Sequence, residues 1–520
     1  MRDERGVGLI GLDCGTQSVR ALLTGPRGQT LALASRPTPT TQVGPGQAEH
    51  DPAALWQTVC DLLTEIAAAA PRGLEVAGIA CASMGEACVL LDAADRPLGP
   101  AITWFDRRTE PDAAWLAEQV GTEHIFAVTG MPLDPTLTLC KLLWHRRRDP
   151  AGFARARRML NLADYIAFRL SGVAATDRSL ASRTLLLETQ RADWSADLLG
   201  RAGLDAALLP PIRPSGTRLG PVRAEVLAAT GLAGRPVVAV GGHDHVVGGF
   251  AAGAVRPGVL LDSIGTAEAL LRTVDRPLLT DATRSLGFWQ GMVALDRPFA
   301  YLGAGINRAG GAIEWLIGLL GERPRAELIA AAAAEKVGSG GVLFLPHLAY
   351  SGAPAVDTAA RGAFLGLTAA SGAGALFRAV LEGLAMEARL AVDAMSALPG
   401  AGPPGEIRVI GGGTRNALLL RIKAAVYGRD LTVIDAPEAT AQGAALLGGI
   451  AAGLWPDLAA ALDAIDQTRH TVAPDADWTA CYATLFRDIY CRVYPALAPL
   501  SHALTGFDAA RATNKQEETG

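Results

Sequence analysis

The chain has 520 residues, of which half are apolar and 19% are charged, and its formal net charge is −5. That length is too great for a single hydrophobic core and predicts two or three well-buried globular domains. The acidic balance gives no reason to expect nucleic-acid binding, and no stretch approaches the roughly 18 uninterrupted apolar residues of a membrane helix. The seven scattered cysteines lack a C-x-x-C spacing, which favours reduced thiols in a soluble cytoplasmic protein over disulfides or a zinc site.

The first half of the chain predicts short strands and one long helix. The apolar periodicity gives these elements in chain order: strands over residues 7–13, 19–24 and 30–34, a helix over about 52–70, and strands over 76–83 and 236–241. The last strand leads directly into Gly242-His243-Asp244-His245. Polar residues next to glycines thus follow the two predicted strands over 76–83 and 236–241.

The second half restarts the strand–turn–strand pattern after Arg256-Pro257-Gly258. The elements predicted there, in chain order, are a helix from 310, a long helix over 375–398, a strand over 407–410, a helix over 416–427, a strand over 431–434 and a helix over 439–452. Strands that alternate with helices predict an α/β fold. We therefore expect an N-terminal domain over residues 1–255, a C-terminal domain over 256–500 and a polar, disordered tail over 501–520.

The most informative feature is a strand that runs into an acid and then into a Gly-Thr turn. Residues 9–20 read Leu-Ile-Gly-Leu-Asp-Cys-Gly-Thr-Gln-Ser-Val-Arg, which places Asp13 at the strand end. A carboxylate near phosphate oxygens must face a cation, and Mg²⁺ binds through one or two carboxylates, water and substrate phosphates. Gly15 permits a tight turn with exposed N–H groups, and Thr16 adds a hydroxyl donor. Taken alone, the turn fits a simple Asx-type cap equally well.

The same turn recurs in residues 260–271, with Gly265 and Thr266 in the place of the first Gly-Thr pair. Two such hairpins facing each other would clamp the phosphates of a nucleotide. Gly310 opens a helix whose N-terminal N–H groups favour anions. None of the four lysines follows a glycine, which excludes a P-loop.

A glycine triplet, Gly411-Gly412-Gly413, ends a strand and precedes a helix. Without side chains, Gly412 and Gly413 would let the backbone lie flat against a nucleoside, although such triplets more often serve as packing turns. Asn416 follows and could either cap the next helix or contact the edge of the adenine.

Asp244 fits the general base of phosphoryl transfer to an alcohol, which needs a carboxylate to accept the hydroxyl proton. A structural aspartate in a glycine-rich turn is the simpler alternative. A metal site is a weaker one, because His243 and His245 would share one face of a strand and no third ligand is apparent.

Two further polar clusters follow apolar runs in the first half: Met84 with Glu86, and Trp104 with Asp106. The two acids could accept hydrogen bonds from substrate hydroxyls, with Trp104 as an apolar wall. On a surface they would be ordinary solvated side chains.

Together these segments resemble the FGGY carbohydrate kinases, which have two actin-like (ribonuclease H-like) α/β domains with an interdomain cleft for ATP and sugar. The resemblance covers roughly residues 7–495. The segments that carry it lie at residues 11–16, 46–52, 242–244, 263–266, 309–316, 344–347, 361–367, 378–387, 411–416 and 438–449.

The resemblance implies ATP- and Mg²⁺-dependent phosphorylation of a small sugar, ketose or polyol, with Asp244 as the base and Asp13 as the Mg²⁺ partner through water. It assigns the ATP site to Asp13, Gly15, Thr16, Gln17, Gly265, Thr266, Gly310, Glu314, Gly412, Gly413 and Asn416. It assigns the acceptor site to Met84, Glu86, Trp104, Asp106 and Asp244. It is also compatible with a homodimer.

The sequence departs from the family pattern in the acceptor region. Ser83-Met84-Gly85-Glu86 replaces the Gln-Met-His of xylulose kinases, and Gly85 stands where glycerol kinases carry an arginine before the acid. The Ser-Met-x-Glu form is also similar to the kinases of autoinducer-2, so the acceptor remains open.

Two non-kinase alternatives share the expected fold. One is a catalytically silent sensor of ATP and sugar, and Asp244 argues against it because a sensor needs no base. The other is an ATP hydrolase of the chaperone or filament type, and the segments typical of sugar kinases argue against that interpretation.

Overall fold

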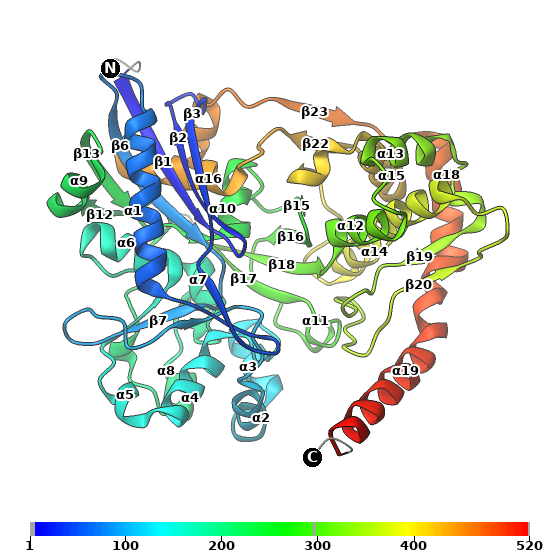
Figure 1. Cartoon of the computed structure of the whole chain (residues 1–520), viewed down its shortest axis with the longest axis horizontal. Coiled ribbons are helices and arrows are strands. Elements are labelled where there is room, and N and C mark those ends of the chain that lie inside the picture. Colours follow the sequence, from blue (N-terminus) through cyan, green and yellow to red (C-terminus); the bar gives the residue numbers. More distant parts are fainter. Residues whose placement is uncertain (1–5, 295–297, 518–520) are drawn as a thin grey trace.

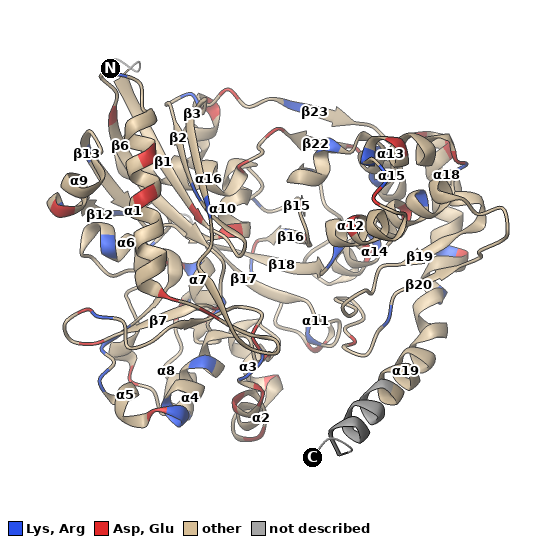
Figure 2. Ribbon diagram, viewed as in Figure 1, with Lys and Arg blue, Asp and Glu red and all other residues tan. Residues whose placement is uncertain are grey.

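The computed structural model describes residues 6–294 and 298–517, and these fold into two α/β halves that lie side by side (Figure 1). Within those residues, each half is built on a seven-stranded sheet. The N-terminal half lies on the left of Figure 1 and the C-terminal half on the right. Acidic and basic residues are interspersed along the ribbon of both halves (Figure 2).

The N-terminal sheet has the order β12-β13-β6-β1-β2-β3, with β14 paired to β6. Its strands are β1 (Val7–Cys14), β2 (Ser18–Thr24), β3 (Thr30–Pro37), β6 (Glu75–Ser83), β12 (Arg218–Pro221), β13 (Gly234–Ala239) and β14 (Gly242–His243). Strands β1 and β14 both run parallel to β6, and their registers place Asp13 and Gly242 on opposite sides of Ala82. The ends of β1 and β14 therefore lie near each other at one edge of the sheet.

The C-terminal sheet has the order β17-β18-β16-β15-β21-β22-β23. Its strands are β15 (Val259–Ile264), β16 (Glu268–Val274), β17 (Trp289–Ala294), β18 (Pro298–Ile306), β21 (Glu406–Ile410), β22 (Leu431–Ile434) and β23 (Arg469–Val472). Strand β15 is antiparallel to β16 and parallel to β21, just as β1 is antiparallel to β2 and parallel to β6. The two halves thus repeat one strand pattern.

Helices cover these sheets and bury their apolar faces. In the N-terminal half these are α1 (Pro52–Ala69), α6 (Leu162–Ser171) and α9 (Ala224–Thr230). In the C-terminal half they are α12 (Ala309–Leu319), α13 (Arg325–Ala334), α14 (Ala373–Ala397), α15 (Ala417–Tyr427), α17 (Leu458–Ala464) and α18 (Ala476–Leu485). Each half has its own large cluster of buried apolar side chains, as expected for a chain of this length.

Two helices join the halves: α10 (Asp244–Ala251) and α16 (Ala439–Ala451), which lie in the centre of Figure 1. A Cβ atom on Gly11 of β1 would lie 1.7 Å from the carbonyl oxygen of Ala441, and one on Gly443 would lie 2.0 Å from that of Val247. Only glycine fits at these points, so α16 from the C-terminal half packs directly on the N-terminal sheet and on α10.

A smaller layer lies below the N-terminal sheet in Figure 1. It contains α2 (Glu110–Gln119), α3 (Thr122–Thr129), α4 (Thr138–Arg148), α5 (Pro150–Ala154), α7 (Arg178–Ser182), α8 (Ala196–Ala202) and the strands β4 (Thr40–Gly44), β5 (Gln47–His50), β7 (Cys88–Leu91), β8 (Ala101–Ile102), β9 (Arg158–Asn161), β10 (Leu187–Glu188) and β11 (Asp193–Trp194). Strand β17 of the C-terminal half reaches this layer: the N–H of Gln290 donates to the carbonyl of Gly130 at 3.0 Å, and that of Met292 donates to Ser182 Oγ at 3.0 Å.

The remaining elements are α11 (Asp281–Ser285), β19 (Leu343–Leu345), β20 (Ala363–Leu365) and α19 (Cys491–Glu517). Helix α19 continues through Glu517, so it includes most of the polar segment after residue 500. Alanine, arginine, lysine and glutamine in this segment are all good helix formers. Residues 518–520 lie outside the described part of the chain. Within that part, no helix is both long enough and apolar enough to cross a lipid bilayer.

Candidate active site

The first Gly-Thr turn joins β1 to β2 and is fixed by its own backbone and by Thr38. The N–H of Gly15 donates to the carbonyl of Ser18 at 3.1 Å, and Thr38 Oγ1 donates to the carbonyl of Gly15 at 2.6 Å. The side chains of Thr16 and Gln17 remain exposed. The turn is therefore rigid, while its hydroxyl and amide side chains face solvent.

Asp13 lies at the end of β1, and its carboxylate accepts no hydrogen bond from any residue that the structure describes. Burial, together with the nearby charges of Asp244 and Glu438, raises its pKa to about 7, and Arg20 partly offsets this. A partly buried carboxylate that faces a second carboxylate is stabilised by a cation. Oxygen donors of this kind fit Mg²⁺, and Asp13 is the residue that would hold it, with water and substrate oxygens as the other ligands.

Asp244 follows the short strand β14 and is the first residue of α10, and its side chain is 23% exposed. Its Oδ1 accepts from the N–H of His245 at 2.6 Å and lies 3.3 Å from Nε2 of His243. Burial lowers the pKa of His243 to about 4, so its imidazole is neutral at pH 7. With Oδ1 held, Oδ2 is the oxygen that remains for a substrate proton.

A buried polar chain holds the segment before Asp244 in place. The N–H of His243 donates to Ser179 Oγ at 2.9 Å, and that hydroxyl donates to Asp177 Oδ2 at 2.5 Å. The rings of His243 and His245 lie 5.4 Å apart. No group of three His, Cys, Asp or Glu side chains able to hold a metal occurs in residues 6–294 or 298–517, so nothing in the described chain supports a histidine metal site here.

The second Gly-Thr turn is held by a helix instead of a threonine. The carbonyl of Gly265 accepts from the N–H of Gly310 at 3.1 Å, and that of Thr266 accepts from the N–H of Gly311 at 3.1 Å. A Cβ atom on Gly310 would lie 2.5 Å from the carbonyl oxygen of Gly265. The first N–H groups of α12 thus support the turn directly, and the turn itself is exposed.

The glycine triplet packs behind this turn, where a Cβ atom on Gly413 would lie 2.3 Å from the side chain of Ile264. Gly412 is exposed. Asn416 caps α15, because its Oδ1 accepts from the N–H of Leu419 at 3.2 Å. Glu314 is exposed on α12 and forms an ion pair with Arg325. Of the two roles that the sequence allows for Asn416, the helix cap is the one seen in the structure.

On the acceptor side, Glu86 has a left-handed backbone with φ of 62° and a buried side chain. Nε of Arg183 donates to its Oε1 at 2.5 Å. The backbone carbonyl of Glu86 accepts from Lys141 Nζ at 3.1 Å. Met84 is buried in the same segment, so its side chain packs in the core and does not line an open surface.

Lys141 is fully buried and also donates to the carbonyls of Ile102 at 3.3 Å and Thr103 at 2.9 Å. Burial lowers its pKa to about 8. Since one ammonium group bonds to both the Glu86 loop and the loop that carries Trp104, it fixes the two acceptor loops relative to each other.

Trp104 is 41% exposed, and its Nε1 donates to Thr16 Oγ1 at 2.8 Å. Asp106, in contrast, is completely buried: its Oδ2 accepts from the N–H of Ala48 at 2.8 Å and from Nη2 of Arg108 at 2.6 Å. Burial alone would raise the pKa of Asp106, but the hydrogen bonds from Arg108 and Ala48 hold it below its usual value. Trp104 is therefore accessible at the surface, whereas the buried carboxylate of Asp106 holds its own loop against the segment that contains Ala48.

The structure adds Arg183, Lys141, Trp289 and Tyr301 to this region, none of which stands out in the sequence. The guanidinium of Arg183 lies 5.1 Å from the ring centroid of Trp289, and Trp289 packs edge-on against Tyr301. The contact of Arg183 with Trp289 joins segments about a hundred residues apart. The one available signal was Gly85, whose missing side chain leaves room for a neighbour.

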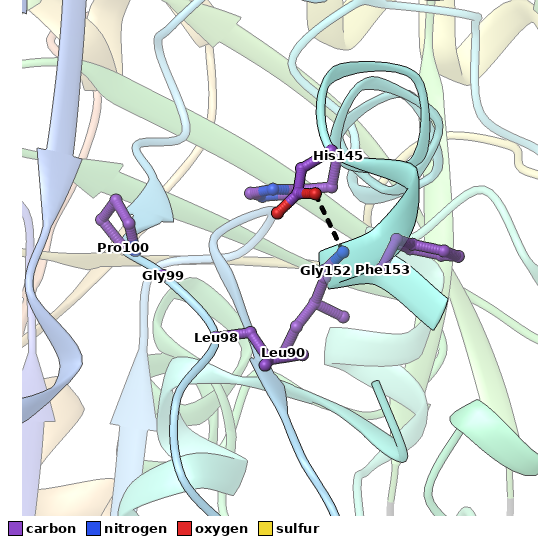
Figure 3. Close-up of a pocket in the computed structure, with 8 residues that line it drawn as sticks. Leu90, Leu98, Gly99, Pro100, His145, Gly152 and Phe153 are labelled. Carbon is purple, nitrogen blue, oxygen red and sulfur yellow. Dashed lines mark hydrogen bonds between the residues drawn. The ribbon is translucent and has the colours of Figure 1, made fainter. Parts of the chain in front are cut away.

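A separate surface pocket of about 40 Å³ lies between the β7–β8 loop and α4 and α5 (Figure 3). Figure 3 shows the ring of His145 and the aromatic ring of Phe153 at its sides. Its volume is close to that of a single water molecule in the liquid, and it contains none of the candidate site residues.

Comparison with known proteins relates most of the chain to one family. The sequence profile of the FGGY family of carbohydrate kinases matches at residues 9–251 (N-terminal domain) and 260–452 (C-terminal domain). A glycerol kinase of Gloeobacter violaceus is 35% identical and covers 87% of this chain and 89% of its own length. A xylulose kinase of Bacillus subtilis is 28% identical and covers 96% of this chain and 99% of its own length.

Among solved structures, a xylulose kinase from Rhodospirillum rubrum superimposes with a TM-score of 0.85 at 30% identity, over 95% of this chain and all (100%) of that one. The expected α/β fold of two actin-like domains is confirmed by this likeness and by the repeated strand pattern.

Proposed function

Since this chain belongs to the FGGY family of carbohydrate kinases, we propose that it transfers the γ-phosphoryl group of ATP to a hydroxyl of a small, neutral sugar, ketose or polyol, with Asp244 as the general base. Glycerol kinase and xylulose kinase relatives support this range of acceptors.

The observation that carries the proposal is the pair of acids at the ends of β1 and β14. Asp13 and Asp244 stand at neighbouring strand ends, close enough that the charge of Asp244 raises the pKa of Asp13. In a kinase these acids have different partners: Asp13 faces Mg²⁺ and the phosphates, and Asp244 faces the acceptor. Bound Mg²⁺ neutralises charge on the phosphates.

The acceptor hydroxyl gives its proton to Oδ2 of Asp244 while its oxygen attacks the γ-phosphorus, and the bond to the β-phosphate oxygen of ATP breaks. The hydrogen bond from the His245 N–H and the neutral His243 ring keep Oδ1 in place during this transfer. In this proposal the exposed Thr16 and Thr266 hydroxyls contact the phosphates from the two turns.

The charge balance of the acceptor side supports a neutral substrate. Arg183 is already neutralised by Glu86, and Asp244 adds a further negative charge beside them. An anionic acceptor such as an aldonic acid would approach two carboxylates whose nearby guanidinium is already paired, which is costly in a partly buried site.

The test is an ADP-release assay with Mg-ATP and a panel of pentuloses, hexuloses, deoxy-ketoses, short polyols, aldonic acids and the autoinducer-2 precursor. We expect one neutral polyol or ketose to raise ADP release far above the acceptor-free rate. ATP binding without release on any acceptor would instead support a silent sensor, and acceptor-independent release would support an ATP hydrolase. A clear preference for the autoinducer-2 precursor would identify the alternative kinase activity.

A further inference from the structure

The backbone at Gly85 is pressed between two side chains of the acceptor region. A Cβ atom on Gly85 would lie 2.9 Å from Cγ of Arg183 and 3.2 Å from Cδ2 of His243. A larger residue at this position would displace Arg183. The glycine before Glu86 therefore creates the space that Arg183, from α7 and its following turn, occupies next to the Asp244 segment.

Arg183 is held on two sides but keeps unused donors. Its Nε and Nη2 both approach Oε1 of Glu86, and its guanidinium lies over Trp289. Its Nη1 contacts only the sulfur of Met131, at 3.7 Å. Thioether sulfur is a weak acceptor, so the N–H groups of Nη1 lack an oxygen partner among the described residues.

Other polar groups that lack hydrogen-bond partners lie around this guanidinium. Among the described residues, Oε2 of Glu86 receives no hydrogen bond, while Nδ1 of His243 and the hydroxyl of Tyr301 are buried without a partner. Tyr301 is 1% exposed, and charges on both Arg183 and Asp244 act on its hydroxyl. Buried polar groups are normally satisfied, so several unpaired ones around one arginine indicate a place for a ligand that carries hydroxyl groups.

We propose that Arg183 determines acceptor specificity: its Nη1 donates a hydrogen bond to a hydroxyl adjacent to the one that Asp244 deprotonates, while Oε2 of Glu86 accepts from the same diol. This inference rests on the proposed kinase function and narrows the acceptor to compounds with vicinal hydroxyl groups. Trp289 and Tyr301 belong to β17 and β18, so the C-terminal half supplies the far wall of this subsite.

A purely structural role for Arg183 makes a different prediction. If the arginine only neutralised buried Glu86, its loss would weaken the fold and would affect ATP and acceptor to the same extent. A contact with the diol instead affects the acceptor alone, and it disappears when the contacted hydroxyl is removed from the acceptor.

The experiment measures equilibrium binding of the acceptor and of ATP, by calorimetry, to wild type, Arg183→Met and Arg183→Lys. The probes are glycerol with its propanediol analogues and D-xylulose with its monodeoxy analogues. Arg201→Met is the matched control, because Arg201 forms an exposed ion pair with Asp197 on α8. The double variant Glu86→Gln/Arg183→Met removes both charges and serves if the single variant fails to fold.

We expect Arg183→Met to weaken acceptor binding about ten- to a hundred-fold, as for loss of a charged hydrogen bond, and to change the Kd of ATP less than twofold. Wild type should discriminate against the analogue that lacks the contacted hydroxyl, and Arg183→Met should not. Retained discrimination, unchanged acceptor binding, or equal losses for ATP and acceptor would each overturn the role of Arg183. Because binding is the readout, a wild type that binds the diol without releasing ADP would refute the kinase proposal while still testing this subsite.

Discussion

The two halves of the molecule use one strand–turn–strand unit for opposite purposes. In the N-terminal unit, Asp13 and Asp244 lie near each other at the ends of β1 and β14, and the pKa of Asp13 is raised to about 7. In the C-terminal unit, Asp262 and Glu268 are sealed inside and both accept from Nζ of Lys423, at 2.5 Å and 2.7 Å. The first half thus retains negative charge at Asp13 and Asp244. In the second half Lys423 balances one acid, and burial raises the pKa of the other, Glu268, to about 8.

Unpaired and paired carboxylates have different effects on the fold. A carboxylate without a partner destabilises the fold but leaves an oxygen for a cation or a proton, whereas a buried pair contributes to one fixed arrangement. The turns differ in the same sense, because a threonine supports the first and the N-terminus of α12 supports the second. The repeated backbone therefore gives one half with acids that keep their negative charge and one half that presents a rigid turn.

The largest effect is expected from removing the buried cation of the C-terminal half. Lys423→Met leaves Asp262 and Glu268 buried without a counter-charge, which should lower the free energy of unfolding by about 3–5 kcal/mol. Denaturant unfolding measures the loss, and the triple variant Asp262→Asn/Glu268→Gln/Lys423→Met should recover much of it. A loss below about 1 kcal/mol would show that this cluster does not stabilise the half.

The opposite result is expected at Asp13, the acid just before the first Gly-Thr turn. Asp13→Asn should lower turnover by about 10²-fold or more, yet it should raise the Tm of the ligand-free protein at pH 8. The sign follows because a folded-state pKa raised from 3.8 to about 7 means that ionised Asp13 destabilises the fold above that pH. Asp463→Asn, an exposed acid on α17, is the control for both readouts. A lower Tm for Asp13→Asn would contradict the contrast between the halves.

The raised pKa of Asp13 also predicts a pH-dependent requirement for Mg²⁺. Below about pH 7 a proton occupies Asp13, so the Mg²⁺ concentration for half-maximal binding of an ATP analogue should rise up to about tenfold per pH unit. Mg²⁺ titrations of wild type and Asp13→Asn between pH 5.5 and pH 8 are compared with each other. Protonation of the nucleotide affects both proteins equally, so the difference between them reports on Asp13. Parallel pH curves for the two proteins would remove Asp13 from the metal site.

The smallest effect is expected at the contact between the acceptor side and the first turn. Trp104→Phe removes the hydrogen bond to Thr16 Oγ1, and the loss of one exposed bond should change the KM for ATP and for the acceptor only about two- to fivefold. Steady-state kinetics against both substrates measures it. An effect confined to one substrate would show that this bond does not couple the two sites.

The sequence was sufficient to predict the repeated strand–turn–strand units, because their periodicity and their Gly-Thr turns are local. It predicted the helix cap at Asn416 as one of two options. It did not predict the contacts of Glu86 with Arg183, which are 97 residues apart, or the burial of Asp106 by Arg108. Nor did it predict that Asp244 begins a helix, since a two-residue strand ends before any periodicity can show the change.

The central claim is that Asp244 is the base of an acceptor-dependent kinase. The most direct measurement is acceptor-dependent ADP release by Asp244→Asn at saturating Mg-ATP, beside calorimetric ATP binding to the same protein. We predict that turnover falls by about 10²-fold or more while ATP affinity stays within a factor of about two, as expected for loss of a general base. Full turnover in this variant would contradict the assignment of Asp244 and, with it, the chemical role of the N-terminal half.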